Sequence, residues 1–386
     1  MAPPASLVHF YGCPPSMFAG KIRSFLRKNA IAYVERLPAD GHYQSVVIPV
    51  LGRIWLPVIE MPDGRIVQDT TEIIDFLEAE YGCESCYPQT PRQRIIALMM
   101  EFFGDEGLLR TVMHYRWNFL DRQGDFIRGE FGSFMAPGTP REDQFRLAEI
   151  PMSQMSAYLP ALGITPETIP QIEDSYRELL AAMDAHLHQM PYLLGGRPSI
   201  GDYGMIAAFH AHLGRDPVPS FQMKCTASRV ARWVERMSAA DSDMPEFAAM
   251  PAAFLDQDAI PETLEPVLRL MATDHLPVIL STVDAVNRWL EANPVEEGAP
   301  IVPKGTRKAL ASHAPEIRGV AARQGVRHYQ IWMLQRIQDA WDALPAADRD
   351  AVDVLLERTG LRPLLTARCT RRIERRDYVE VWGRAN

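Results

Sequence analysis

The sequence predicts an α/β domain at the N-terminus, followed by an all-α domain and a mainly helical extension. Two observations predict this order. Short alternating apolar segments accompany the first helical patterns up to residue 86, and long patterns with a helical period begin at residue 92. A chain of 386 residues is also too long for one core. We expect domains at 1–86 and 92–250, and an extension at 251–386.

The first half of the α/β domain reads as strand, helix, strand. Residues 6–11 are apolar and alternating, which is typical of a strand. Gly12 and two prolines end it, and Ser16 stands where a helix N-cap is expected. The helix that follows places the apolar side chains of 17–26 on one face, and 32–37 alternates as a second strand.

The second half of this domain carries the most informative motif. Residues 56–59 read as a strand that includes Pro57, and a hairpin turn follows at 61–64. A proline at this place is a candidate for a cis peptide bond, which would turn the backbone N–H and C=O of Leu56 toward an extended ligand. Asp69 and Thr70 then open a helix whose N-terminus suits a carboxylate. The pattern predicts a site for a small peptide with a free carboxylate.

This order of elements resembles the thioredoxin-like domain, and the site resembles the glutathione-binding half of the cytosolic glutathione transferases. The resemblance implies that Leu56 pairs with the backbone of glutathione, and that Asp69 and Thr70 hold its γ-glutamyl group. It also implies a catalytic role for Ser16, because Ser16 matches the helix-opening motif in which a serine or cysteine precedes two basic residues. Ser16 would then stabilise the glutathione thiolate as a hydroxyl donor.

Three other interpretations of this loop stay open. Ser16 can be only an N-cap, as most serines before helices are. Tyr11 ends the first strand, where other classes of the family place a catalytic tyrosine. Cys13 lies three residues before the register of a glutaredoxin-type cysteine, so a half-buried loop thiol is the simpler interpretation.

The motif departs from the family at two places. Asp69 and Thr70 stand where Glu-Ser or Gln-Ser is usual, although the acid and the hydroxyl are retained. Trp55 occupies the position at which a lysine or glutamine often contacts the glycine carboxylate of glutathione. Arg53 and His42 are the nearby residues that can compensate.

The second domain shows helical periodicity over 92–103 and 172–190. Ser199 and Asp202 have the spacing of a capping box, which after a Gly-Gly-Arg-Pro turn resembles the helical transferase domain. By the same resemblance, Tyr115 and Trp117 are candidates for the pocket of the hydrophobic substrate. Ordinary core aromatics are the alternative.

No metal site is expected. Cys83 and Cys86 form a Cys-x-x-Cys without a second pair, so zinc would lack two ligands, and a linker thiol pair is the preferred interpretation. Histidines at two-residue spacing on helices, such as His210 and His212, point to different faces.

The extension reads as helices at 260–271, 275–290 and 329–344, with a connector rich in proline and glycine at 293–305. Its last part, 368–384, is rich in arginine, and the acidic body of the same chain is a simpler acceptor for it than an acidic partner.

The composition narrows the classes of partner and the cellular compartment that we expect for this protein. A net charge of −9 disfavours nucleic acid or an anionic membrane as the main partner. Neither a membrane-spanning run nor a signal segment is evident, and five cysteines fit a reducing compartment, so we expect the cytoplasm.

Together with the resemblance, these features predict a glutathione transferase, expected as a homodimer, that joins glutathione, its co-substrate, to a hydrophobic electrophile. A glutathione-dependent isomerase or lyase is the alternative enzyme, and a non-catalytic binding module is the alternative of another class.

Overall fold

The structure is a computed structural model that describes residues 7–302 and 309–386. Ser6, which opens the first predicted strand, and 303–305 of the predicted connector lie outside the described residues.

The N-terminal domain is built on a four-stranded sheet in the order β2-β1-β3-β4. Its strands are β1 (Val8–Tyr11), β2 (Tyr33–Arg36), β3 (Val58–Glu60) and β4 (Ile66–Gln68), and its helices are α1 (Met17–Lys28), α2 (Ile48–Leu51) and α3 (Thr70–Tyr81). β1 runs parallel to β2, whereas β3 is antiparallel to both of its neighbours, β1 and β4. The thioredoxin-like fold predicted from the sequence is confirmed.

The register of the strands decides where a site can form. Tyr11 at the end of β1 pairs with Val58 at the start of β3, which pairs with Gln68 at the end of β4. The chain segments that follow β1, precede β3 and follow β4 therefore lie together at one edge of the sheet, where these strands begin or end. This edge is the one to which the sequence analysis assigned Ser16, Leu56 and Asp69.

Local signals in the sequence explain the ends of these elements. The Ser16 hydroxyl accepts a hydrogen bond from the backbone N–H of Ala19 and caps α1, and the Asp69 carboxylate caps α3. Gly82 ends α3 in the left-handed conformation, at a φ of 63°. The peptide bond between Leu56 and Pro57 is cis, as expected.

The predicted helical region follows. Its helices are α4 (Pro91–Phe102), α5 (Leu109–Trp117), α6 (Leu120–Met135), α7 (Arg141–Ser156), α8 (Ile169–His186), α9 (Ile200–Ala208), α10 (Pro217–Thr226) and α11 (Ser228–Ser238). The capping box is confirmed, because the Asp202 carboxylate accepts from the Ser199 backbone N–H and the Ser199 hydroxyl accepts from that of Asp202. α9 packs against both α1 and α4, at the junction of the two regions.

The extension holds the helices α12 (Glu265–Asp274), α13 (Leu276–Ala292), α14 (Tyr329–Asp342), α15 (Ala346–Thr359) and α16 (Pro363–Thr366). It also holds the paired strands β5 (Ser312–His313) with β8 (Gln324–Gly325), β6 (Glu316–Ile317) with β7 (Val320–Ala321), and β9 (Arg371–Arg376) with β10 (Val379–Ala385).

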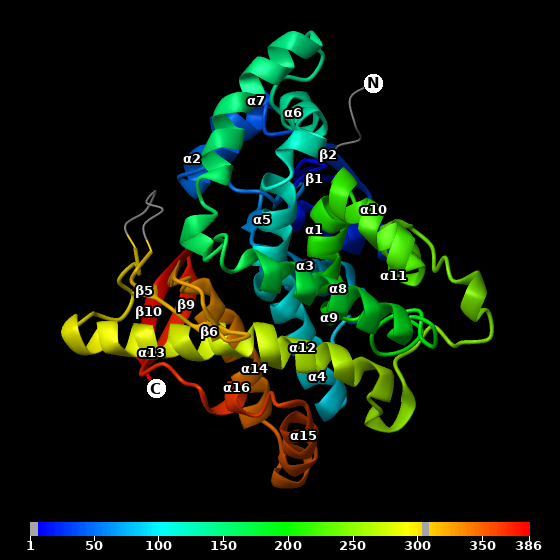
Figure 1. Cartoon of the computed structure of the whole chain (residues 1–386), viewed down its shortest axis with the longest axis vertical. Coiled ribbons are helices and arrows are strands. Elements are labelled where there is room, and N and C mark those ends of the chain that lie inside the picture. The colour runs from blue at the N-terminus through cyan, green and yellow to red at the C-terminus, as the bar shows by residue number, and fades with distance from the viewer. Residues whose placement is uncertain (1–6, 303–308) are drawn as a thin grey trace.

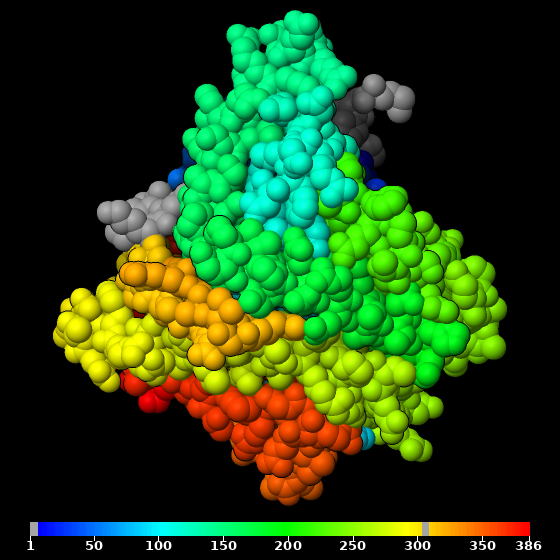
Figure 2. Space-filling model, viewed as in Figure 1, coloured from blue at the N-terminus to red at the C-terminus, as the bar shows by residue number. Residues whose placement is uncertain are grey.

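The extension packs back onto the other two regions. α14 and α15 contact α4, and in Figure 1 the yellow α13 runs across the lower left of the molecule, above α16 and α15. On the face shown in Figure 2, the yellow and orange parts of the extension lie directly against the green helices. The arginine-rich end forms the β9–β10 hairpin, and its Arg372 pairs with Asp339 of the same chain at 2.6 Å.

Candidate functional site

A cavity of about 460 Å³ lies at the sheet edge where the three chain segments meet, a size typical of small-molecule sites. Three residues assigned to the site from the sequence lie on its wall, namely Leu56, Asp69 and Thr70. The other lining residues are Phe18, Arg53, Trp55, Pro57, Gln68, Glu106, Tyr158, Ala161, Leu162, Val302, Ala309, Gly325, Val326, Arg327, His328, Tyr329, Arg375 and Glu380.

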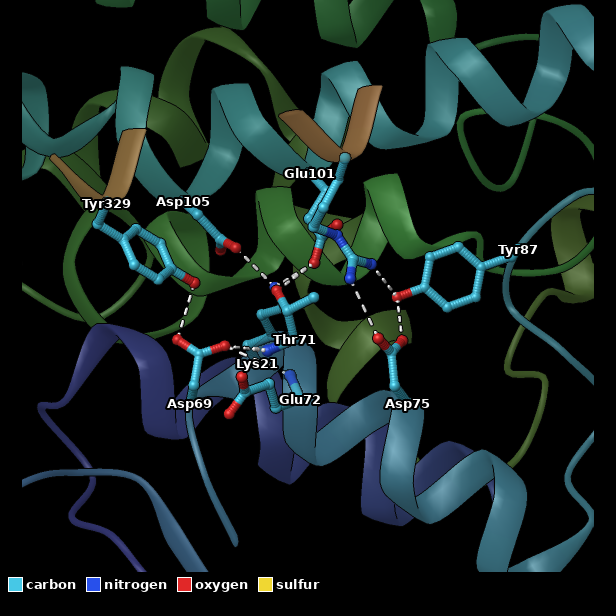
Figure 3. Close-up of polar contacts among 10 residues, drawn as sticks. Lys21, Asp69, Thr71, Glu72, Asp75, Tyr87, Glu101, Asp105 and Tyr329 are labelled. Carbon is cyan, nitrogen blue, oxygen red and sulfur yellow. Dashed lines mark hydrogen bonds and ion pairs between the residues drawn. The ribbon is translucent and has the colours of Figure 1, made fainter. Parts of the chain in front are cut away.

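The Asp69 carboxylate is fixed from two sides. Its Oδ1 accepts from the backbone N–H groups of Thr71 at 3.0 Å and Glu72 at 3.3 Å, at the start of α3. Its Oδ2 accepts from the hydroxyl of Tyr329 at 2.7 Å, as Figure 3 shows. Asp69 is 9% exposed. Since each carboxylate oxygen can accept more than one hydrogen bond, Oδ2 retains capacity for a ligand donor.

A buried polar cluster packs against the start of α3 (Figure 3). The ammonium of Lys21 lies 2.8 Å from Glu101 Oε1 and 2.6 Å from Asp105 Oδ2. The hydroxyl of Thr71 donates to the same Glu101 oxygen at 2.7 Å. Burial raises the pKa of the Asp105 carboxyl, and the Lys21 ammonium beside it opposes this shift. The cluster connects α1, α3 and α4 and makes the base of the site rigid.

Of the residues proposed to activate sulfur, Ser16 has the most suitable environment. Its oxygen accepts from Ala19 N at 3.3 Å, which leaves the hydroxyl hydrogen available to a ligand. Ser16 is half-buried at the same sheet edge, although it is not among the residues that line the cavity. Tyr11 is fully buried and donates to Glu60 Oε2 at 2.7 Å, and burial raises its pKa.

Cys13 is 3% exposed, and burial raises the pKa of its thiol to about 12. A thiol with such a pKa is almost entirely protonated at neutral pH, and the thiolate is the reactive form. The sequence analysis favoured a half-buried loop thiol, and the structure buries Cys13 more fully than that.

We therefore expect Cys13 to react slowly with Ellman's reagent at pH 7.5, and Cys13→Ser to leave glutathione-dependent activity largely intact. Cys225 is exposed and is expected to react first. Mass spectrometry of peptides after timed labelling measures both rates. Rapid labelling of Cys13, or rapid glutathione-dependent disulfide reduction that Cys13→Ser abolishes, would contradict this assignment.

The structure distinguishes the two residues considered as replacements for the missing lysine or glutamine. Arg53 lines the cavity, and its guanidinium carbon lies 3.6 Å from the centre of the Trp55 ring. Stacking on the indole keeps this cation beside the cavity wall. His42 instead lies 3.0 Å from Glu60 Oε1 and is not a lining residue.

The largest departure from the sequence analysis is the contribution of the extension. Tyr329 contacts Asp69, and Arg375 donates to Gln68 Oε1 at 2.9 Å and to Glu72 Oε1 at 3.0 Å. In the sequence, periodicity indicated the helix that begins at Tyr329, and composition indicated the arginine-rich end. The sequence contained no signal for contacts between these residues and the N-terminal domain, which lies more than 250 residues earlier in the chain.

The two aromatic residues assigned to a hydrophobic pocket do not line this cavity. Tyr115 is 2% exposed and its ring stacks on Phe119, and Trp117 is 4% exposed and packs edge-on against Phe131. The structure places both in the helical core. The apolar side chains that reach the cavity from the helical region belong instead to Tyr158, Ala161 and Leu162.

Within the described residues, no group of three or more His, Cys, Asp or Glu side chains could hold a metal ion. Cys83 and Cys86 are both free thiols. Over the same residues, no helix has both the length and the apolar composition needed to cross a membrane.

Comparison with known proteins finds a family similar to the N-terminal domain. Residues 7–86 match the family model described as glutathione S-transferase, N-terminal domain. A search of curated proteins finds no match.

Several solved structures are similar at low identity. A glutathione S-transferase from Methylobacterium radiotolerans, in complex with glutathione sulfonate, is 18% identical over 66% of this chain and 99% of its own, with a TM-score of 0.36. A β-etherase from Sphingobium sp. strain SYK-6 is 18% identical over 62% and 97%, with a TM-score of 0.39. A glutathione transferase from Phanerochaete chrysosporium is 15% identical over 61% and 97%, with a TM-score of 0.39.

Proposed function

Because residues 7–86 match the N-terminal domain of glutathione S-transferases, we propose that this protein joins the sulfur of glutathione to an electrophilic carbon of an apolar small molecule. In this reaction a sulfur–carbon bond forms, the bond to a leaving group such as halide breaks, and the thiol proton passes to solvent. One observation carries the proposal: Leu56, Asp69 and Thr70 share one cavity with a set of apolar side chains.

The polar residues of the cavity suit the charged ends of glutathione. Asp69 would bind the γ-glutamyl ammonium through Oδ2, and Thr70 at the N-terminus of α3 would bind the neighbouring carboxylate. Leu56 would pair with the peptide backbone, and Arg53 would bind the glycine carboxylate in place of the usual lysine or glutamine. In this arrangement we expect the sulfur to lie near the N-terminus of α1, which Ser16 caps.

Ser16→Ala is expected to lower conjugating activity about ten- to a hundredfold, because a hydrogen bond to a charged group contributes roughly 1.5–3 kcal/mol. Glutathione binding should change much less, since the lost contact is made chiefly with the thiolate. Initial rates with benzyl chloride, beside glutathione affinity from calorimetry, measure the two effects.

Ser16→Thr is the matched control, because it retains the hydroxyl and the N-cap. Tyr11→Phe should leave the rate unchanged, since the Tyr11 hydroxyl is held by Glu60. If Ser16→Ala leaves the conjugation rate unchanged and Tyr11→Phe lowers it, the assignment of Ser16 to sulfur activation is wrong.

A second candidate is a module that binds glutathione without conjugating it. Two observations favour it: Tyr329 already donates to the Asp69 oxygen that a ligand ammonium would use, and Ser16 does not line the cavity. In that case glutathione still binds, but benzyl chloride is consumed at the uncatalysed rate in the parent protein and in Ser16→Ala alike.

A further inference from the structure

A second, smaller cavity lies beside the proposed glutathione site, where α5 and α8 of the helical region meet the extension. We call it the inner cavity, and its volume is about 30 Å³. Glu106, Leu162 and Arg327 line both cavities, so these side chains form the partition between them. Since one water molecule needs at least about 10–15 Å³ of such volume, the inner cavity has room for one or two small groups but not for an aromatic ring.

Buried polar atoms without a partner gather around the inner cavity. Among the described residues, fourteen buried side-chain nitrogen or oxygen atoms have no hydrogen-bond partner, and seven of them belong to residues that line this one cavity. The six residues that carry these atoms are Glu106, Arg110, His275, Gln324, Arg327 and Gln330. Because buried polar groups in native proteins are almost always hydrogen-bonded, this concentration indicates a small ligand that the groups share.

Most of the seven atoms are hydrogen-bond donors. Four of them can only donate, namely the side-chain amide nitrogens of Gln324 and Gln330, and Nε of Arg110 and Arg327. Burial and the charge of Arg327 lower the pKa of His275 to about 3, so its neutral ring supplies one further N–H near pH 7. The one carboxylate atom, Glu106 Oε2, lies 2.8 Å from Arg327 Nη2. A water molecule accepts only about two hydrogen bonds, whereas an anion accepts from every donor around it, so the set favours an anion.

The charge on the wall of the inner cavity also favours an anion. Arg110 is half-buried and forms no ion pair with a carboxylate of the described residues, and its Nη2 donates to Gly163 O at 3.2 Å. Burial lowers the pKa of Arg110 to about 10, and the charge of Asp274 offsets only part of this effect. Asp274, the second carboxylate on the wall, is itself bound to Arg318 at 2.6 Å. A cation that loses hydration without gaining a counterion is costly, and a small anion beside Arg110 removes this cost.

The start of α13 adds partial positive charge at the same place. This helix is 17 residues long, His275 immediately precedes it, and Val278 in its first turn lines the inner cavity. The side chain of His275 does not cap the helix. The dipole of α13 therefore favours negative charge in the inner cavity, in addition to the guanidinium of Arg110.

We propose that the inner cavity binds one small monovalent anion, of which chloride is the most common, between Arg110 and the donors of the extension. Arg110 belongs to α5 of the helical region, whereas His275, Gln324 and Arg327 belong to the extension. The anion stabilises the folded form by linking these two regions, and it holds Arg327, which also lines the glutathione cavity. Binding of the anion does not depend on any reaction of glutathione.

Two measurements on the full-length protein test this site. The melting temperature should rise saturably when chloride replaces gluconate at constant ionic strength, because the inner cavity is too small for gluconate. Crystals soaked in sodium bromide should show one anomalous bromide peak beside Arg110 Nε.

Three variants decide whether these effects arise in the inner cavity. Arg110→Met removes the charge but keeps the length of the side chain, and it should weaken chloride binding about tenfold or more and abolish the bromide peak. Gln324→Leu removes a neutral donor, should weaken binding less, and decides the question if Arg110→Met does not fold. Arg177→Met on α8 is the matched control, because Arg177 is 56% exposed and pairs with Asp174, and it should keep both effects.

Three results would overturn the inference. The first is an equal melting temperature in chloride and gluconate, with only water density in the inner cavity. The second is a chloride effect that is the same in the parent protein, Arg110→Met and Gln324→Leu. The third is a bromide peak without a saturable chloride effect, which would mark an adventitious ion only.

Discussion

Asp69→Asn is expected to weaken glutathione binding about ten- to a hundredfold, because it removes the charge that would pair with the γ-glutamyl ammonium. The asparagine oxygen can still accept from Thr71 and Glu72 and cap α3. The melting temperature without ligand should therefore change little, whereas the rise with millimolar glutathione should nearly disappear. Differential scanning fluorimetry with and without glutathione measures both quantities.

Two further variants separate recognition from folding. Asp69→Ala should also lose the glutathione effect, but it should melt earlier because the cap of α3 is lost, at a cost of about 1 kcal/mol. Asp63→Asn, on an exposed turn, makes the same chemical change and should bind glutathione normally. An unchanged glutathione effect in Asp69→Asn would show that the γ-glutamyl group binds elsewhere.

Arg375→Met is expected to lower the free energy of unfolding by about 3 kcal/mol, because it leaves the carboxylates of Glu380 and Glu72 without the buried cation that they share. The Arg375 side chain is 5% exposed and pairs with Glu380 and Glu72. Glu72 is 37% exposed, which places the effect at the lower end of the range for buried pairs. Methionine keeps the length of the side chain and its apolar contacts. Urea unfolding followed by circular dichroism gives the difference.

The control for this prediction is Arg288→Met, also in the extension. Arg288 is 65% exposed and pairs with Asp284, which is 60% exposed, so its loss should cost less than about 0.5 kcal/mol. Equal small effects of the two substitutions would mean that the β9–β10 hairpin does not hold the extension to the N-terminal domain.

The fold of the N-terminal domain could be predicted because its signals are local. Alternation identified the strands, Ser16 and Asp69 identified two helix starts, and Pro57 indicated the cis peptide bond. The capping box of Ser199 was predictable for the same reason. The homodimer, the cytoplasmic location and the boundaries 1–86, 92–250 and 251–386 remain predictions.

The composition of the cavity wall could be predicted only in part. Leu56, Asp69 and Thr70 follow a motif within fifteen residues, so they were identified correctly as neighbours. Tyr329 and Arg375 reach the same cavity through tertiary packing, which periodicity does not encode. Aromatic content indicated Tyr115 and Trp117, but aromatic side chains fill cores as readily as pockets.

The most direct test of the central claim is isothermal titration of the parent protein with glutathione. The account predicts saturable binding of one glutathione per chain, a melting temperature that rises with ligand concentration because the folded form alone binds, and no binding of the dipeptide Cys-Gly, which lacks the γ-glutamyl group. Absence of heat and of any thermal shift at millimolar glutathione, or equal binding of Cys-Gly, would contradict the assignment of this cavity as a glutathione site.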